Sequence, residues 1–306
     1  MTFPQEKQDR IMLRLHAGQA SVNERADAWG EAIKHLEEWI KIDPKNPAAH
    51  VRLARALFRT NQGKKAYVRA KKASVLSNKF AKAPILIAQF YSETGQEELA
   101  EQWLSEAEKR YSNDLTTRLV LAEREWRRGR KADAKRHAKA ASQIDPTSAK
   151  AALLVGMIAQ LEHDFTKAER SYAMARDSAP KEFAPRNYLA LVLALQGGED
   201  KLEDALRLAQ ANRQDFPNSA VAAATLGFVQ QQMGQPQEAV KNLQLAGSAG
   251  RGTADMAYIF AKFWADQGEK ERARKVLGQL LSSSNNKTLF VLRRNAEQLY
   301  RQLGGR

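Results

Sequence analysis

The sequence predicts an all-α protein, a right-handed α-solenoid of about eight helix–turn–helix repeats followed by a C-terminal capping helix. Three observations support this fold class. Only 9 prolines and 17 glycines interrupt a chain of 306 residues, and the stretches between them are rich in good helix formers such as Ala, Leu, Glu and Arg. No run of alternating β-branched residues indicates a strand. Small residues also recur at a fixed period along most of the chain.

The period is set by two registers of small residues. In the first register, alanine recurs every 34 positions, with one three-residue insertion near "GGEDKLED", at Ala32, Ala66, Ala100, Ala134, Ala168, Ala205, Ala239 and Ala273. The second register lies twelve residues earlier (fifteen in the repeat with the insertion) and holds only Ala or Gly, at Ala20, Ala54, Ala88, Ala122, Gly156, Ala190, Gly227 and Ala261. Small residues let two helices cross closely, so each repeat is predicted to be a pair of helices.

Turn residues separate the two registers and place the helices. They are "QG" at 62–63, Gly95, Gly129, "GG" at 197–198, Gly234 and Gly268. In one repeat, "AKAALLVGMIAQL" predicts the first helix and "FTKAERSYAMARDSAP" predicts the second, with Ala168, Tyr172 and Ala175 as its buried anchors. One repeat exposes its apolar face until the next repeat covers it.

The domain boundaries follow from these repeats. We expect an N-terminal extension over 1–12, a solenoid over 13–286 and a C-terminal capping helix over 287–306. The repeats begin near 13, 47, 81, 115, 149, 183, 220 and 254. The first repeat is the weakest, because Gly18 falls inside its expected first helix. The capping helix places its apolar residues on one face, at Leu289, Leu292, Ala296, Leu299 and Leu303.

The pattern resembles the tetratricopeptide repeat family, and in particular its bacterial members. In "AVAAATLGFVQQQMGQPQEAVKNLQLA", residues 220–246, the pair Leu226-Gly227, then Gly234 and Ala239 stand in the order typical of the family. The resemblance covers roughly residues 13–286. It implies a non-catalytic scaffold or adaptor that binds a segment of another protein in a concave groove lined by the first helices.

Composition argues against several other classes of function. The chain has no cysteine, and its five histidines have no partner at i+3 or i+4, so neither disulfides nor a zinc site is expected. No nucleotide-binding, zinc-protease or nucleophile-elbow motif is present, so we expect no catalytic residue, no metal and no cofactor. We see neither an apolar run that would span a membrane nor a signal peptide. These features predict a cytoplasmic protein, or a periplasmic or envelope one if the chain is a fragment.

The net charge of +14 is concentrated in one block. Between Lys45 and Ser92 there is no Asp or Glu, and the basic residues are Lys45, Arg52, Arg55, Arg59, Lys64, Lys65, Arg69, Lys71, Lys72, Lys79 and Lys82. Arg52, Arg55 and Arg59 share one face of a first helix, and the resemblance places that face in the groove. They are therefore the candidate basic end of a ligand site. Lys65, Arg69 and Lys72 form a similar row on the second helix, toward the convex side.

The basic block has three interpretations. It is a solvated surface, a site for an acidic peptide or chain-terminal carboxylate, or a site for nucleic acid or another polyanion. The groove has a second candidate region, apolar in character, formed by Leu153, Met157, Asn187, Tyr188 and Leu191. Inter-helix packing is the alternative role for these side chains.

The sequence therefore predicts a protein-interaction scaffold whose partner is another protein or a peptide segment, with a preference for acidic ligands. Two alternatives remain open: a polyanion-binding module for nucleic acid or anionic polysaccharide, and the repeat region of a larger bacterial envelope or polysaccharide-export protein. Salt dependence separates polyanion binding from apolar groove binding. The sequence leaves the oligomeric state and the identity of the partner open.

Overall fold

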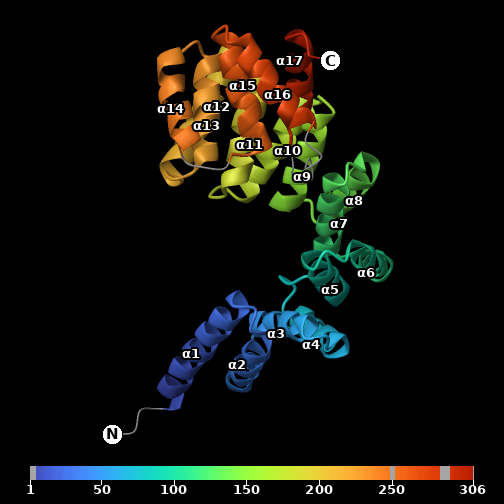
Figure 1. The fold of residues 1–306 in the computed structure, drawn as a ribbon. Coiled ribbons are helices and arrows are strands. Elements are labelled where there is room, and N and C mark those ends of the chain that lie inside the picture. Colours follow the sequence, from blue (N-terminus) through green and yellow to red (C-terminus); the bar gives the residue numbers. More distant parts are fainter. Residues whose placement is uncertain (1–4, 249–251, 283–289, 306) are drawn as a thin grey trace. The chain divides into compact units, whose positions relative to one another are not determined.

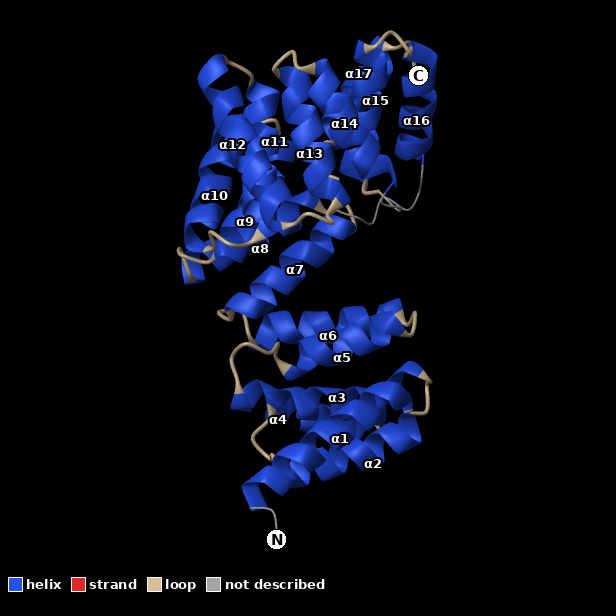
Figure 2. Cartoon of the chain, turned by 90° about the vertical axis from the view of Figure 1, so that its left-hand side faces the viewer, coloured by secondary structure: helices blue, strands red, loops and turns tan. Residues whose placement is uncertain are grey.

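The predicted all-α class is confirmed by the computed structural model, which describes residues 5–248, 252–282 and 290–305 (Figure 1). These residues contain seventeen helices and no strand (Figure 2). Two compact units divide the chain, Met1–Leu121 and Ala122–Arg306, and each is described by itself.

The first unit consists of helix pairs in which each helix contacts the next in sequence. Its helices are α1 (Gln5–Arg25), α2 (Trp29–Ile42), α3 (Pro47–Arg59), α4 (Gly63–Leu76), α5 (Ala83–Glu93) and α6 (Glu97–Arg110), followed by the start of α7 (Leu115–Arg127), which runs across the division. The first helices α3 and α5 also contact each other. Helix α1 begins at Gln5, inside the segment 1–12, and Gly18 lies within it.

The second unit also contains helix pairs, such as α9 with α10 and α13 with α14. Its helices are α8 (Lys131–Ile144), α9 (Ala149–Leu161), α10 (Phe165–Ser178), α11 (Phe183–Gln196), α12 (Glu199–Asp215), α13 (Ala220–Gln232), α14 (Pro236–Ser248), α15 (Ala254–Asp266), α16 (Lys270–Ser282) and α17 (Arg293–Gln302). The first helices α9, α11, α13 and α15 contact one another in series. Stacked first helices therefore form one continuous surface of this unit.

Both registers of small residues are buried, as the repeat pattern predicts. All eight alanines of the first register are fully buried, and every residue of the second register is buried. The glycines of the second register show why size matters. A Cβ at Gly156 would lie 2.6 Å from the ring of Tyr172, whose hydroxyl donates a hydrogen bond to Gln160 Oε1 at 2.8 Å. No side chain fits between α9 and α10 at this crossing.

The turn between the two helices of a repeat needs a residue with positive φ. Glycine fills this position in several repeats, as predicted, but Asp27 (φ 55°), Asn61 (φ 59°) and His163 (φ 60°) fill it in three others. Asn, Asp and His are the non-glycine residues that adopt this conformation most readily. Of the "QG" at 62–63, Gly63 begins α4, so Asn61 makes the turn there.

The capping helix α17 packs on α15 and α16. Leu292, Ala296 and Leu299 are buried and Leu303 is half-buried, whereas Leu289 lies outside the described residues. An apolar face of this kind ends the stack, because the last pair would otherwise expose its own apolar surface.

Gly156→Ala should destabilise the chain, because the new methyl group meets the ring of Tyr172 and overpacking of this kind costs about 1–3 kcal/mol. Gly18→Ala is the matched control. A Cβ at Gly18 meets nothing within 4 Å, so this substitution should stabilise α1 by about 0.4–1 kcal/mol. Urea unfolding of both variants measures the two effects. Equal shifts in the same direction would contradict the close crossing of α9 and α10.

Candidate binding surfaces

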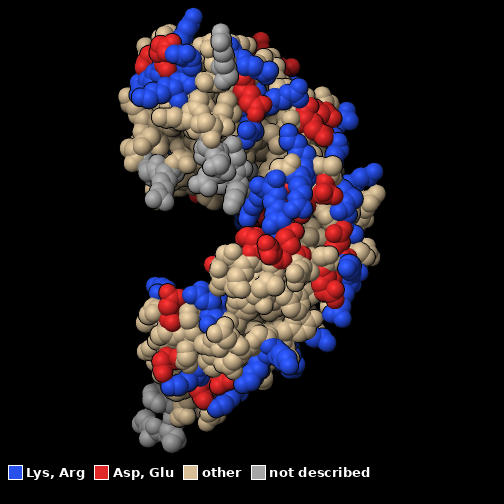
Figure 3. Space-filling model, turned by 45° about the vertical axis from the view of Figure 1, so that its right-hand side comes forward, with Lys and Arg blue, Asp and Glu red and all other residues tan. Residues whose placement is uncertain are grey.

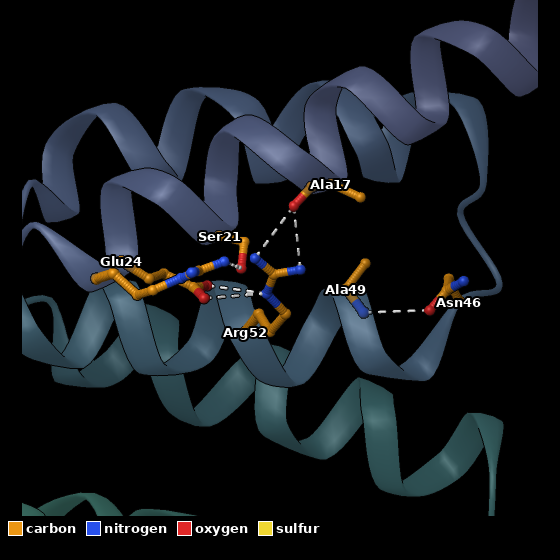
Figure 4. A network of polar contacts seen from close by, with 7 residues as sticks. Ala17, Ser21, Glu24, Asn46, Ala49 and Arg52 are labelled. Carbon is orange, nitrogen blue, oxygen red and sulfur yellow. Dashed lines mark hydrogen bonds and ion pairs between the residues drawn. The ribbon is translucent and has the colours of Figure 1, made fainter.

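Arg52 of α3 holds two repeats of the first unit together (Figure 4). Its Nε donates to both carboxylate oxygens of Glu24 on α1, at 2.9 and 3.2 Å, and its two terminal nitrogens lie 3.4 Å from the carbonyl oxygen of Ala17. The guanidinium also lies 5.4 Å from the ring centre of Trp39. Only 24% of the side chain is exposed, so Arg52 has a structural role in this state of the molecule.

The other two groove arginines are paired in the same way. Arg55 Nη2 lies 2.8 Å from Glu93 at the end of α5, and its guanidinium is 5.6 Å from the ring of Phe90. Arg59 Nη2 lies 3.1 Å from Asp27 in the turn between α1 and α2. Each arginine of the predicted basic groove thus has an acidic partner on a neighbouring repeat, so their charges are locally compensated.

Helix α4 differs from α3 in this respect. Lys82 of the basic block pairs with Asp114 at 3.3 Å. Within the described residues, however, no acidic side chain pairs with the cations of α4, which are Lys64, Lys65, Arg69, Lys71 and Lys72. Over much of the visible surface, by contrast, basic and acidic side chains lie next to each other (Figure 3). The net positive charge of the block is therefore concentrated on α4.

The apolar candidate region contains a pocket of about 180 Å³ in the second unit. The pocket lies among the first helices α11, α13 and α15, and its lining includes Phe183, Asn187, Tyr188, Leu191, Val221, Thr225, Asp255, Met256 and Ile259. The structure thus brings together Asn187, Tyr188 and Leu191. Leu153 and Met157 are not part of this lining; they belong to α9, where Met157 is buried and Leu153 is half-buried.

Polar side chains in the pocket are held in place by specific contacts. Asn187 Oδ1 accepts a hydrogen bond from Thr225 Oγ1 at 2.8 Å. The ring of Tyr188 stacks on Tyr172 with a centroid distance of 5.6 Å and an interplanar angle of 22°. Burial, and to a smaller extent the neighbouring Asp255, raises the pKa of Tyr188 above its ordinary value. The phenol therefore stays neutral over the physiological pH range.

Asp255 is a buried polar residue of the pocket lining that the sequence pattern did not indicate. It lies in the first turn of α15 with 7% of its surface exposed, and its Oδ1 accepts a hydrogen bond from the backbone amide of Leu292 at 2.9 Å. Burial raises the pKa of this carboxyl to about 7, against the lowering effect of the amide hydrogen bonds from Leu292 and Val291. The only sequence signal was an acidic residue in the first turn of a largely apolar helix.

Histidines and carboxylates form no larger cluster in the described part of the chain. His16 and His35, far apart in sequence, face each other with their Nδ1 atoms 3.1 Å apart. Among the described residues, no group of three or more His, Cys, Asp or Glu side chains is arranged to hold a metal ion. Within the same residues, every helix is too short or too polar to cross a bilayer.

Residues 25–74 match a family model described as tetratricopeptide repeat. These residues include α2, α3 and most of α4. No curated protein matches the chain.

Several solved structures are similar to this chain. A chain in the structure of the APC/C hetero-tetramer Cut9-Hcn1 has 14% identity and a TM-score of 0.57, with 90% of this chain and 52% of the other covered. PilW, described as a widely conserved type IV pilus biogenesis factor, has 17% identity and a TM-score of 0.52, with 67% and 96% covered. A thermophilic tetratricopeptide repeat protein of Thermus thermophilus has 16% identity and a TM-score of 0.49, with 62% and 98% covered. At these identities, the first two similarities show the fold alone.

Arg52→Gln should lower the free energy of unfolding by about 1–3 kcal/mol, because it leaves a half-buried Glu24 without its charged partner. Glu24→Gln should have a similar effect, and the double variant should lose less than the sum of the two. Urea unfolding of the three variants gives the coupling free energy. A coupling of zero would mean that the ion pair does not stabilise the contact between α1 and α3.

The raised pKa of Asp255 predicts a pH effect of definite sign. Between about pH 4 and pH 7 the folded state holds a proton that the unfolded state has lost, so the contribution of Asp255 to stability falls as pH rises through this range. Tyr172 and Tyr188, which couple to it, remain neutral there because burial raises their pKa values. Asp255→Asn should therefore gain stability relative to the native chain between pH 5 and pH 8. Asp200→Asn, at an exposed position, is the control, and a pH-independent difference for Asp255→Asn would contradict the prediction.

Proposed function

We propose that the chain, which is a tetratricopeptide repeat protein, is a non-catalytic scaffold that binds a segment of a partner protein on its first-helix surface. Tetratricopeptide repeats generally serve protein–protein interaction, because their stacked helices present an extended surface without a deep catalytic cavity. One observation supports this location of the binding site. The pocket among α11, α13 and α15 is lined by apolar side chains with a few fixed polar groups, which is the usual character of a recognition site.

The size of the pocket favours a side chain as its occupant. Its volume of about 180 Å³ is smaller than the roughly 300–1,000 Å³ typical of sites for drug-sized molecules. An apolar anchor residue of a peptide would suit this space. Tyr188 and Asn187 are polar residues of the lining, and such residues can contact a peptide backbone. We therefore expect recognition of one large apolar side chain within an extended or helical segment.

The acidic preference of the groove at Arg52, Arg55 and Arg59 stays a hypothesis. An acidic ligand would have to exchange with Glu24, Glu93 or Asp27, which already compensate these arginines. Charge reversal of the three arginines would also break contacts between repeats. A loss of binding in such a variant would therefore report on the fold as well as on the ligand.

Polyanion binding is the second candidate function, because the cations of α4, which have no acidic partner among the described residues, would attract any anionic ligand. Binding of nucleic acid or anionic polysaccharide would weaken steeply with salt, since counterions are released in proportion to the charges neutralised. Binding of an apolar side chain in the pocket would change little with salt. The hypothesis of a bacterial envelope or polysaccharide-export protein rests on the family resemblance alone.

Val221→Phe should weaken peptide binding, because the larger side chain fills the pocket from its half-buried rim. A peptide library displayed on phage and selected against the native chain supplies the ligands, and fluorescence anisotropy of the selected peptides measures their affinity. Val240→Phe, the same change at a half-buried position on α14 outside the lining, should leave binding intact. We expect a loss of at least about tenfold for the pocket variant.

Two results would count against the proposed site. Equal affinity of the selected peptides for both phenylalanine variants would place binding elsewhere. Affinity that falls steeply with salt for every selected ligand would favour the polyanion alternative.

A further inference from the structure

We propose that the outer face of α4 is a second docking surface, and that it binds an acidic amphipathic helix of a partner protein. This surface belongs to the first unit and shares no residue with the pocket among α11, α13 and α15. The proposal therefore goes beyond the scaffold function and can fail independently of it.

The first observation is the absence of charge compensation on this helix. Second helices of other repeats carry basic residues paired with an acid one turn away on the same helix. Such pairs occur on α2, α6, α8, α12 and α16, for example Lys34–Glu31, Arg110–Glu106, Arg136–Asp133, Arg207–Asp204 and Arg274–Glu271. Helix α4 has no acidic residue, and among the described residues none from another helix pairs with its cations. Its charge is thus free to meet an external anion.

The second observation is that the basic residues of α4 lie where they destabilise the helix. Lys64 and Lys65 lie in the first turn of α4, where the helix dipole is positive and favours acidic residues. Lys65, Arg69 and Lys72 are neighbours at i, i+4 and i+7, so their like charges repel along one face. The fully buried Ala66, Ala70 and Ala73 hold the helix in place from the inner side. A bound anionic partner would remove the repulsion that the isolated chain retains.

The third observation is a pair of exposed valines within the basic face. Val68 is 63% exposed and Val75 is 73% exposed. The pattern Lys-Lys-x-x-Val occurs twice in α4, at 64–68 and 71–75, so both the lysine pairs and the valines repeat with a spacing of seven residues. A seven-residue repeat keeps one face of a helix in register with a partner helix. An apolar seam flanked by cations is complementary to an apolar seam flanked by acids.

These features favour a protein helix over nucleic acid or a lipid surface. Single-stranded nucleic acid needs free aromatic rings for stacking, but Tyr67, the aromatic residue of α4, packs against Trp103 with a centroid distance of 5.5 Å. A phosphate backbone would leave Val68 and Val75 in water. Two valines offer too little apolar surface to bind a bilayer strongly. At about 1.5 Å per residue, the 14 residues of α4 match a partner of about two heptads.

The test uses the full chain and a synthetic probe. The probe is a fluorescein-labelled helical peptide of about three heptads, with leucines along one seam and glutamates on both sides of it. Lys65→Glu with Lys72→Glu should weaken binding by at least about tenfold, as measured by anisotropy. Lys241→Glu with Lys275→Glu changes the net charge by the same amount at exposed positions of α14 and α16 and should leave the affinity unchanged.

A second pair of variants tests the valines. Val68→Ser with Val75→Ser should weaken binding of the peptide several-fold at both low and high salt, because it removes apolar contact area and no charge. Met174→Ser with Leu245→Ser is the control, since both side chains are 51% exposed on α10 and α14. A peptide with serines in place of the leucines should bind the native chain more weakly than the parent peptide.

Folding of the variants is checked by thermal unfolding. Lys65→Glu with Lys72→Glu removes like-charge repulsion and places an acid in the first turn of α4, so its melting temperature should be equal to that of the native chain or higher. The pocket variant Val221→Phe should bind the acidic peptide with native affinity, which separates the two proposals. The inference is overturned if the control variants lose as much affinity as the α4 variants. It is also overturned if oligothymidylate or anionic vesicles bind to α4 while the acidic peptide does not.

Discussion

The close crossing of the two helices within each repeat is the constraint on which the other features depend. Alanine or glycine stands at every position of the two registers, and each of them is buried. At Gly156 even a methyl group would collide with Tyr172. Helices that approach this closely need only a narrow apolar stripe for their packing. The remaining faces can therefore vary in sequence without changing the fold, and this freedom allows one repeat to be basic and another to line an apolar pocket.

The basic residues of α3 and α4 show how helix packing determines which charged side chains are free to contact a partner. The basic block is uniform in sequence, but α3 directs Arg52, Arg55 and Arg59 toward acids on neighbouring repeats. Helix α4 directs its lysines away from its buried alanine face. A guanidinium that is planar and forms two hydrogen bonds suits the fixed contacts between repeats, whereas the flexible lysines suit solvent or an approaching partner. The division of arginine and lysine between the two helices of this repeat follows that difference.

The fold could be predicted because its determinants are periodic, whereas the sites depend on contacts that periodicity does not specify. Asn187, Tyr188 and Leu191 were predicted as groove residues since they occupy repeated positions of a first helix, and they do line the pocket. The partners of the arginines were not predicted. Glu24 is 28 residues from Arg52 and Glu93 is 38 residues from Arg55, distances near one repeat that bring side chains together only once the stacking geometry is known. The turn residue His163, which stands where other repeats have glycine and adopts a φ of 60°, was not predicted either.

Asp255 shows how a single buried carboxyl group can connect the apolar pocket to the end of the stack. Asp255 is one of the residues that line the pocket, and its carboxyl group accepts the amide hydrogen bond of Leu292 immediately before α17. An apolar residue of the same size could not hold that amide, and an unpaired amide buried there would cost about 1–3 kcal/mol. The charged form is itself disfavoured by burial, which is why the pKa is raised to about 7. The proposed ligand would change the solvation of Asp255 on entering the pocket, and Asp255 is the group that accepts the amide hydrogen bond at the start of the capping helix.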